Sequence, residues 1–156
     1  RLQSLSRVHE LLRVPVLDLA ENGLIAAGLQ VVLTLPRQLP DAATVRLREL
    51  DLSRNTELGN DGARVLAACP QLAGLRALKL AGCGIGEMGA RALAESPHLT
   101  QLVSLDLGNN PIHDPGFRPF LEAPYLRSLR ELIPPTAGVS QPMLQALANR
   151  YPRTRR

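Results

Sequence analysis

One short stretch of the sequence has the spacing of a phosphate-binding loop. Gly84, Gly86 and Gly89 match the pattern G-x-G-x-x-G, and the apolar residues 75–80 before them are typical of a strand. In a dinucleotide-binding unit such glycines allow a tight turn and let the backbone approach a pyrophosphate, while an acid about 20 residues later binds the ribose. Asp106 lies at about that distance. Taken alone, this stretch predicts nucleotide binding.

The other reactive residue types do not form a recognisable site. Two cysteines, Cys69 and Cys83, are too few for a disulfide framework, and His9, His98 and His113 lack the spacing of metal ligands. The sequence also offers no Ser/His/Asp set and no carboxylate pair of the kind that catalysis uses. We therefore predict that the protein is not an enzyme and has no catalytic residue, no metal site and no cofactor.

The composition limits the possible classes of protein. The chain of 156 residues corresponds to one domain, and its aromatic content is only 3% while leucine occurs 31 times, so the core must be aliphatic and built from many similar layers. The net charge of +4 would suit a polyanion, but few aromatic residues are present to stack on bases. No apolar stretch approaches the roughly 18 residues of a membrane span. The cysteine usage favours a cytoplasmic protein.

A repeat explains the abundance of leucine. Four segments superpose when the chain is compared with itself, each follows L-x-x-L-x-L-x-x-N/C, and their starts are 33, 28 and 27 residues apart. The pattern positions are Val14, Leu17, Leu19 and Asn22; Leu47, Leu50, Leu52 and Asn55; Leu75, Leu78, Leu80 and Cys83; and Leu102, Leu105, Leu107 and Asn110. Alternating leucines turn one face of a short strand inward, and stacking of the copies then forms the core.

This pattern resembles the leucine-rich repeat family, and within it the ribonuclease-inhibitor-like class, in which every unit carries a helix. Residues 93–110 are similar in style to short bacterial leucine-rich repeats. The resemblance implies an α/β fold, namely a right-handed leucine-rich repeat solenoid with about five parallel strands on its concave face and short helices on its convex face. It also implies a scaffold for recognition whose partner is a protein.

The repeat changes the interpretation of the glycines. Gly84 and Gly86 have no fixed counterpart in the sister copies, whereas Gly89 does. The recurring position is occupied by Gly28, Gly62, Gly89 and Gly116. We expect this glycine to let each helix begin close to the adjacent turn, because it has no Cβ. A repeat turn without a bound nucleotide is therefore predicted.

One leucine-rich repeat domain is expected over residues 1–156, with atypical ends. Leu5 and Leu11 precede Val14 at the spacing that also occurs before Leu75, and Pro134 takes a leucine position, where it cannot donate to a strand ladder. The expected units are a partial repeat or N-terminal cap at 1–13, repeats at 14–46, 47–74, 75–101 and 102–128, a degenerate C-terminal cap at 129–150 and a frayed tail at 151–156. The long first repeat indicates an inserted loop around residues 34–45.

The last position of the pattern predicts a structural ladder. An asparagine side chain both donates and accepts, so in a buried turn it can satisfy backbone groups that the curve leaves unpaired. A cysteine there is a small filler with a weak donor. The predicted ladder residues are Asn22, Asn55, Cys83 and Asn110.

The strand face is the predicted binding surface. Its outward positions carry five acids and one base, a net charge of −4, so the rest of the chain must carry +8 to reach +4. Because parallel strands lie about 4.8 Å apart, Asp18 should lie beside Asp51, with Lys79 between Asp51 and Asp106. The predicted partner-binding residues are Asp18, Glu49, Asp51, Arg54, Lys79, Asp106 and Glu131. Such a face would select a basic or polar protein segment and reject nucleic acid; an ordinary solvated face is the alternative.

Three other functions stay open at the level of sequence. The chain could be the regulatory or substrate-recognition part of a larger enzyme, such as a ligase, a GTPase-activating protein or a nuclease regulator, or it could be a purely structural spacer. Nucleic-acid binding rests on the net charge and on Arg48, Arg76 and Arg130, which share one repeat position. The shortage of aromatic residues argues against it.

Overall fold

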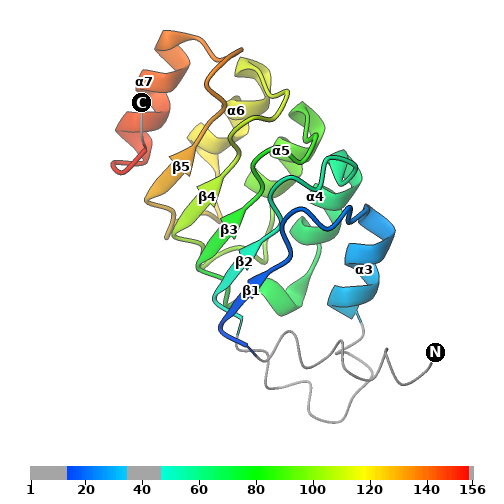
Figure 1. Ribbon diagram of the computed structural model, residues 1–156. Helices are drawn as coiled ribbons and strands as arrows, with labels where there is room; N and C mark the ends of the chain where they lie inside the picture. The colour runs from blue at the N-terminus through cyan, green and yellow to red at the C-terminus, as the bar shows by residue number, and fades with distance from the viewer. Residues whose placement is uncertain (1–13, 35–46, 155–156) are drawn as a thin grey trace, which may run out of the picture.

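The computed structural model describes residues 14–34 and 47–154 of the chain. In these ranges short strands and helices alternate along the sequence (Figure 1). The strands are β1 (Val16–Asp18), β2 (Glu49–Asp51), β3 (Ala77–Lys79), β4 (Ser104–Asp106) and β5 (Glu131–Ile133). The helices are α3 (Ala26–Thr34), α4 (Gly59–Ala67), α5 (Glu87–Ala94), α6 (Asp114–Glu122) and α7 (Gln141–Arg150), with a short 3-10 turn, η3 (Pro70–Leu72). The expected partial repeat at 1–13 and nearly all of the expected inserted loop lie outside the described residues.

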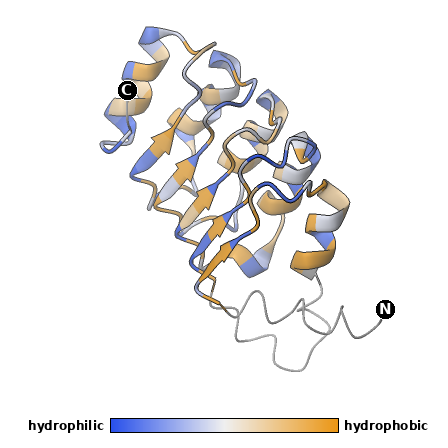
Figure 2. Cartoon of the chain, in the orientation of Figure 1, coloured by the Kyte–Doolittle hydropathy of each residue, from blue (hydrophilic) through white to orange (hydrophobic). Residues whose placement is uncertain are grey.

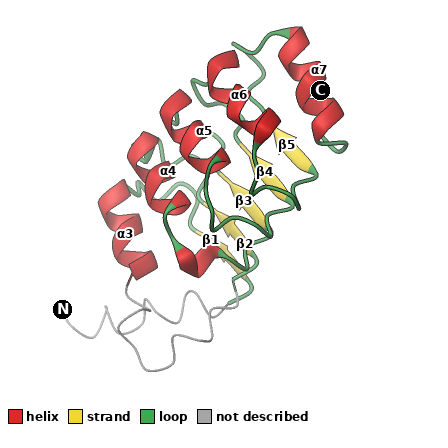
Figure 3. Ribbon diagram, turned by 180° about the vertical axis from the view of Figure 1, so that it is seen from behind, coloured by secondary structure: helices red, strands yellow, loops and turns green. Residues whose placement is uncertain are grey.

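The five strands form one parallel sheet in the order β1-β2-β3-β4-β5, so each strand pairs with the next one along the chain. Seen from behind, the helices form a row that covers one side of this sheet (Figure 3). The prediction of an α/β repeat with five parallel strands and helices on one side is thus confirmed. We call the opposite side of the sheet, which no described helix covers, the strand face.

The core consists of the leucines that the repeat pattern places inward. The central residue of every strand is a buried leucine, and Leu17, Leu50 and Leu78 lie directly opposite one another in the register of β1, β2 and β3. Each strand has at least one polar residue beside its central leucine, and in β2 and β4 both outer residues are polar, so hydrophobic and hydrophilic residues occur together on every strand (Figure 2). Each unit buries its leucines only against the neighbouring units, which is why the copies must stack.

The recurring glycine lies where a helix meets the preceding helix. A Cβ added at Gly89 would lie 2.7 Å from Oδ1 of Asn60 and 3.0 Å from the Cβ of Ala63. At Gly116 it would lie 3.1 Å from the Cα of Glu87. All three distances are too short for an ordinary contact, so glycine allows α5 and α6 to pack closely against their predecessors.

Asn110 links two repeats through backbone groups. Its Oδ1 accepts hydrogen bonds from the backbone N–H groups of Cys83 and Ile85, each at 3.0 Å. Its Nδ2 donates to the carbonyls of Leu80 and Leu107, at 2.8 and 3.0 Å. The side chain is 5% exposed. It therefore satisfies groups of the preceding repeat and of its own.

Asn55 makes the same set of bonds one repeat pair earlier. Its Oδ1 accepts from the N–H groups of Asn22 and Leu24, and its Nδ2 donates to the carbonyls of Leu19 and Leu52. Asn55 is fully buried. In both cases one amide replaces the water that these four backbone groups lose.

The two other ladder positions differ from this arrangement. Cys83 is buried, and its Sγ donates to the carbonyl of Leu52 at 3.1 Å, so it supplies a donor to the preceding repeat. Asn22 is exposed, and within the described ranges its Nδ2 donates only to the carbonyl of Ala20, at 2.9 Å. The expectation of a buried turn does not hold at Asn22, because no described repeat packs in front of it.

The expectation of a frayed C-terminal tail is wrong for residues 151–154. Tyr151 is 1% exposed, and its hydroxyl donates to the carbonyl of Phe120 at 2.6 Å. Beyond it, the N–H of Arg153 donates to the carbonyl of Arg130, just before β5. A buried aromatic ring with a hydrogen-bonded hydroxyl holds this segment in place. The charged composition of the tail does not indicate that contact.

Candidate functional site

The sheet register sets the order of charges on the strand face. Asp18 lies opposite Asp51, Asp51 opposite Lys79, and Lys79 opposite Asp106. The expected neighbours are therefore side by side, with the single lysine between two aspartates. The first residues of the strands form a second column, in which the register places Glu49 beside Ala77 and Ser104 beside Glu131. Two small residues, Ala77 and Ser104, therefore separate the two acids of this column.

Lys79 compensates only one of its two acidic neighbours by a direct contact. Its Nζ lies 3.5 Å from Oδ2 of Asp51, and no ion pair within 4 Å joins it to Asp106 in the described chain. Burial acts to raise the pKa of Asp51, but the hydrogen bond from the N–H of Ser53 and the ammonium group of Lys79 outweigh it, so the pKa lies below its ordinary value. Asp51 is thus held in its charged form on this face.

The three aspartates also have a structural role that the sequence pattern does not reveal. Oδ1 of each accepts a hydrogen bond from the backbone N–H two residues later, at 2.9, 2.9 and 2.8 Å for Asp18, Asp51 and Asp106. This bond closes the turn at the end of the strand, as an Asx-turn does. The Asp that recurs at this position therefore supports the turn and is also available to a partner, although Lys79 stands at the same position in β3.

Arg54, which we predicted on the binding surface, lies in the turn that follows β2. It has a φ of +62°, and the equivalent residue after β1, Glu21, has a φ of +58°. The guanidinium of Arg54 pairs with the carboxylate of Glu21 at 2.5 Å. The charge of Arg54 is therefore already engaged beside the strand face.

A small hollow marks the acidic end of the strand face. Its volume is about 80 Å³, and it lies over β1, β2 and β3. The residues that line it are Val16, Asp18, Glu49, Leu50, Asp51, Ala77 and Lys79. Asp18 and Glu49 are exposed, and within the described ranges neither has an ion pair with a basic side chain. The hollow therefore has an apolar wall at Val16 and two uncompensated carboxylates.

At the opposite end of the strand face, on β4 and β5, an acidic side chain is hydrogen-bonded to a polar one. The hydroxyl of Ser104 donates to Oε2 of Glu131 at 2.8 Å, across the register of β4 and β5. Both residues are partly buried. Glu131 therefore contributes negative charge but has a partner within the sheet.

A side chain of the preceding repeat binds the backbone of the glycine-rich stretch. Oδ1 of Asn60 accepts hydrogen bonds from the N–H groups of Gly86 and Gly89, at 2.9 and 2.8 Å. Gly84 has a φ of +69°, and a Cβ there would lie 2.6 Å from the carbonyl oxygen of Thr56. Two of the N–H groups at the start of α5 therefore already have an acceptor, and close packing explains the glycines at 84 and 89.

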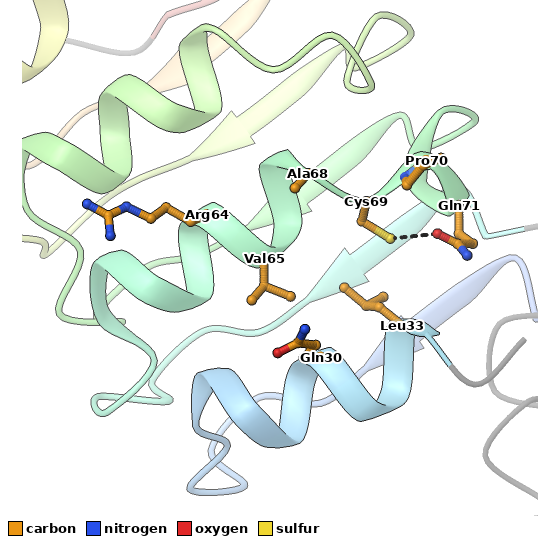
Figure 4. A pocket seen from close by; sticks show the side chains of 8 residues that line it. All are labelled: Gln30, Leu33, Arg64, Val65, Ala68, Cys69, Pro70 and Gln71. Atoms are coloured by element: carbon orange, nitrogen blue, oxygen red, sulfur yellow. Dashed lines mark hydrogen bonds between the residues drawn. The ribbon is translucent and has the colours of Figure 1, made fainter. Parts of the chain in front are cut away.

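A second hollow lies on the helix side, between α3 and α4 (Figure 4). It has a volume of about 290 Å³ and is lined by Gln30, Leu33, Arg64, Val65, Ala68, Cys69, Pro70 and Gln71. The thiol of Cys69 is buried and donates to Oε1 of Gln71 at 3.1 Å. The charged group at the rim, Arg64, is paired with Asp61. The described residues that line this crevice form an apolar wall and offer no charge without a partner to orient a ligand.

In the parts of the chain that the structure describes, no group of His, Cys, Asp or Glu side chains has the arrangement of a metal site. Across the same residues, none of the helices combines the length and apolar character needed to cross a bilayer.

Comparison with known families identifies the repeats. A family profile described as "Leucine Rich repeat" matches residues 47–67, 75–94 and 96–120. Residues 47–120 of the chain are therefore leucine-rich repeats of the ribonuclease-inhibitor-like type, as the sequence pattern indicates. No catalytic domain is found beside them. A search of curated proteins returned no match to the chain.

Proposed function

We propose that this leucine-rich repeat chain binds a protein partner on its strand face, and that the face selects a basic segment of that partner. Leucine-rich repeat domains are generally protein-interaction modules. The observation that carries the finer proposal is the hollow beside Asp18 and Glu49, where two exposed carboxylates have no cation in the described chain. An arginine or lysine side chain would lay its apolar stem on Val16 and its charge between these acids.

The alternative of an ordinary solvated face accounts for part of the pattern only. Turn hydrogen bonds explain why Asp18, Asp51 and Asp106 recur. They do not explain Glu49, whose exposed carboxylate has no hydrogen bond or ion pair in the described chain. Like charges that lie directly across strands disfavour the folded sheet, so the pairing of Asp18 with Asp51 supports a binding role for this corner.

The experiment uses the triple variant Asp18→Asn, Asp51→Asn, Asp106→Asn. Asparagine keeps the side-chain oxygen that closes each turn, so the variant removes charge with little change in structure. A matched control, Glu57→Gln, Asp61→Asn, Glu95→Gln, removes three exposed acids on the helix side. A labelled arginine-rich peptide and a pull-down from the source organism are the two assays.

Binding of the peptide should weaken in the triple variant and stay unchanged in the control, and it should weaken with added salt, as contacts between exposed charges do. Partners captured by the wild type should be lost from the triple variant. Equal binding and the same partners for all three proteins would contradict the proposal and leave the spacer as the better explanation.

Regulation or substrate recognition within a larger enzyme would use the same surface. In that case the basic segment belongs to the substrate or to the enzyme's own catalytic part, and the triple variant should lower activity without abolishing the chemistry. Cys69 and Cys83 are buried and form no disulfide in the described chain, which suits a cytoplasmic setting for either version.

A further inference from the structure

A row of arginines runs along the edge of the sheet where the strands begin. Consecutive backbone hydrogen bonds connect its members: the N–H of Arg76 donates to the carbonyl of Arg48 at 2.7 Å, and that of Val103 to the carbonyl of Arg76 at 2.8 Å. The row continues as the N–H of Arg130 donates to Val103 and that of Arg153 donates to Arg130, both at 2.9 Å. We call Arg48, Arg76, Arg130 and Arg153 the arginine row.

The last member of the row is brought there by the fold. Arg153 follows the buried Tyr151, whose hydroxyl is bonded to the carbonyl of Phe120. This anchor places Arg153 beside Arg130, although the two are far apart in the sequence and Arg153 belongs to no repeat. Three of the arginines share one position of the repeat in the sequence, and the packed C-terminal segment adds the fourth.

The side chains of the arginine row are available to a partner. All four residues are exposed. Nη1 of Arg48 donates to the carbonyl of Gly74 at 2.7 Å. For Arg76, Arg130 and Arg153 the described residues provide no side-chain hydrogen bond and no acidic partner. By contrast, Arg64 and Arg91 on the helix side are each paired with an acid.

The spacing of the row defines what it can bind. Neighbouring strands lie about 4.8 Å apart, so the row spans roughly 19 Å, which about six residues of an extended chain would cover. Val103, which is partly buried, separates the pair Arg48 and Arg76 from the pair Arg130 and Arg153. We propose that the arginine row binds an extended acidic protein segment, with carboxylates at both ends and an apolar residue over Val103. Guanidinium groups recognise carboxylates through paired hydrogen bonds.

The neighbouring acids favour a peptide over a nucleic acid. Glu49 follows Arg48 directly in the sequence, and Glu131 follows Arg130, so the acidic strand face begins next to the row. A single extended peptide can lie along the row without covering that face. A nucleic acid carries a broad, continuous negative charge, which the strand face would repel.

This surface is separate from the hollow on the strand face, and neither proposal requires the other. The test uses the double variant Arg76→Gln, Arg130→Gln, because neither guanidinium takes part in the fold. The control Arg64→Gln, Arg91→Gln removes the same charge from the helix side. The probe is the fluorescein-labelled peptide Glu-Glu-Ala-Val-Ala-Glu-Glu, with the same peptide carrying Gln in place of Glu and a short single-stranded oligothymidylate as comparisons. Fluorescence anisotropy at low salt gives the affinities, and thermal unfolding checks that all proteins are folded.

The wild type should bind the acidic peptide more tightly than the Gln peptide and more tightly than the oligothymidylate. The row variant should lose about threefold or more of this affinity, as expected for the removal of two exposed ion pairs, while the control should lose less than that. The proposal is overturned if both variants lose the same affinity, if the Gln peptide binds equally well, or if the oligothymidylate binds more tightly than the acidic peptide. The last result would show a nucleic-acid site.

Discussion

The side chain of Asn60, near the start of α4, caps the following helix: its Oδ1 accepts a hydrogen bond from the N–H of Gly89, at 2.8 Å. The same oxygen accepts from Gly86, the N-cap residue of α5, which has no side chain of its own to do this. A cap is normally supplied from within the helix. Here the preceding repeat supplies it, so capping and stacking depend on each other.

We expect Asn60→Ala to destabilise the protein, because two N–H groups of α5 lose their acceptor. The loss should be about 1 kcal/mol in the free energy of unfolding, which is typical of a lost helix cap. Asn60→Asp keeps the oxygen at a helix N-terminus, where negative charge is favourable, and should retain the stability. Urea unfolding of the three proteins checks this. Equal stability of the alanine and aspartate variants would show that the cap contributes nothing.

The ladder asparagines should differ in the cost of their removal. Asn55→Leu and Asn110→Leu each strand backbone groups of two repeats in a buried turn, and a buried polar group without a partner costs about 1–3 kcal/mol. Asn22→Leu should cost less, since Asn22 is exposed and, among the described residues, its side chain bonds only to the carbonyl of Ala20. The midpoints of chemical unfolding give the order. If Asn22→Leu proved as costly as Asn110→Leu, the contacts between repeats would not be the cause.

Cys83 should be unreactive in the folded protein. Burial raises the pKa of its thiol from 9.0 to about 11, and the nearby carboxylates of Asp51 and Asp106 add to the rise. At pH 8 native protein should therefore take up iodoacetamide far more slowly at Cys83 than urea-unfolded protein does, as peptide mass spectrometry would show. Similar rates in both states would mean that the turn opens readily.

The same shift predicts a loss of stability in alkali. Between pH 9 and about 11 the unfolded chain releases the proton of Cys83 while the folded chain keeps it, so the folded state binds more protons. The contribution of this thiol is complete below pH 9 and is lost as the pH rises through the folded pKa. Cys83→Ala removes this contribution and should show a smaller fall in the free energy of unfolding between pH 8 and pH 11.

The contact between Tyr151 and Phe120 should matter for the C-terminal end. Tyr151→Phe leaves the carbonyl of Phe120 without its donor in a buried site, so we expect a cost of about 1–3 kcal/mol. Tyr125 is 45% exposed, and Tyr125→Phe is the matched control, with a change near zero expected. Differential scanning calorimetry compares the two. Should both variants melt with the wild type, the tail would not contribute to the stability of the fold.

Much of the fold follows from the sequence alone. The alternation of leucines and the recurrence of Asn or Cys predict short parallel strands that share one core, and the register then places Lys79 between Asp51 and Asp106. These features repeat along the chain, so a comparison of the chain with itself reveals them. The same comparison shows that Gly84 and Gly86 do not recur together in the sister copies, so this glycine pair is poor evidence for a nucleotide.

Only the tertiary structure decided what the unrepeated residues do. The bond from Asn60 to α5, the packing of Gly84 on Thr56 and the anchoring of Tyr151 join parts of the chain that are distant in the sequence and follow no period. Such contacts depend on how the units stack, since a hydrogen bond requires a distance and a direction that residue types do not specify. For the same reason Arg153 joins the arginine row only when Tyr151 is buried. The residue types of this charged segment do not reveal that contact.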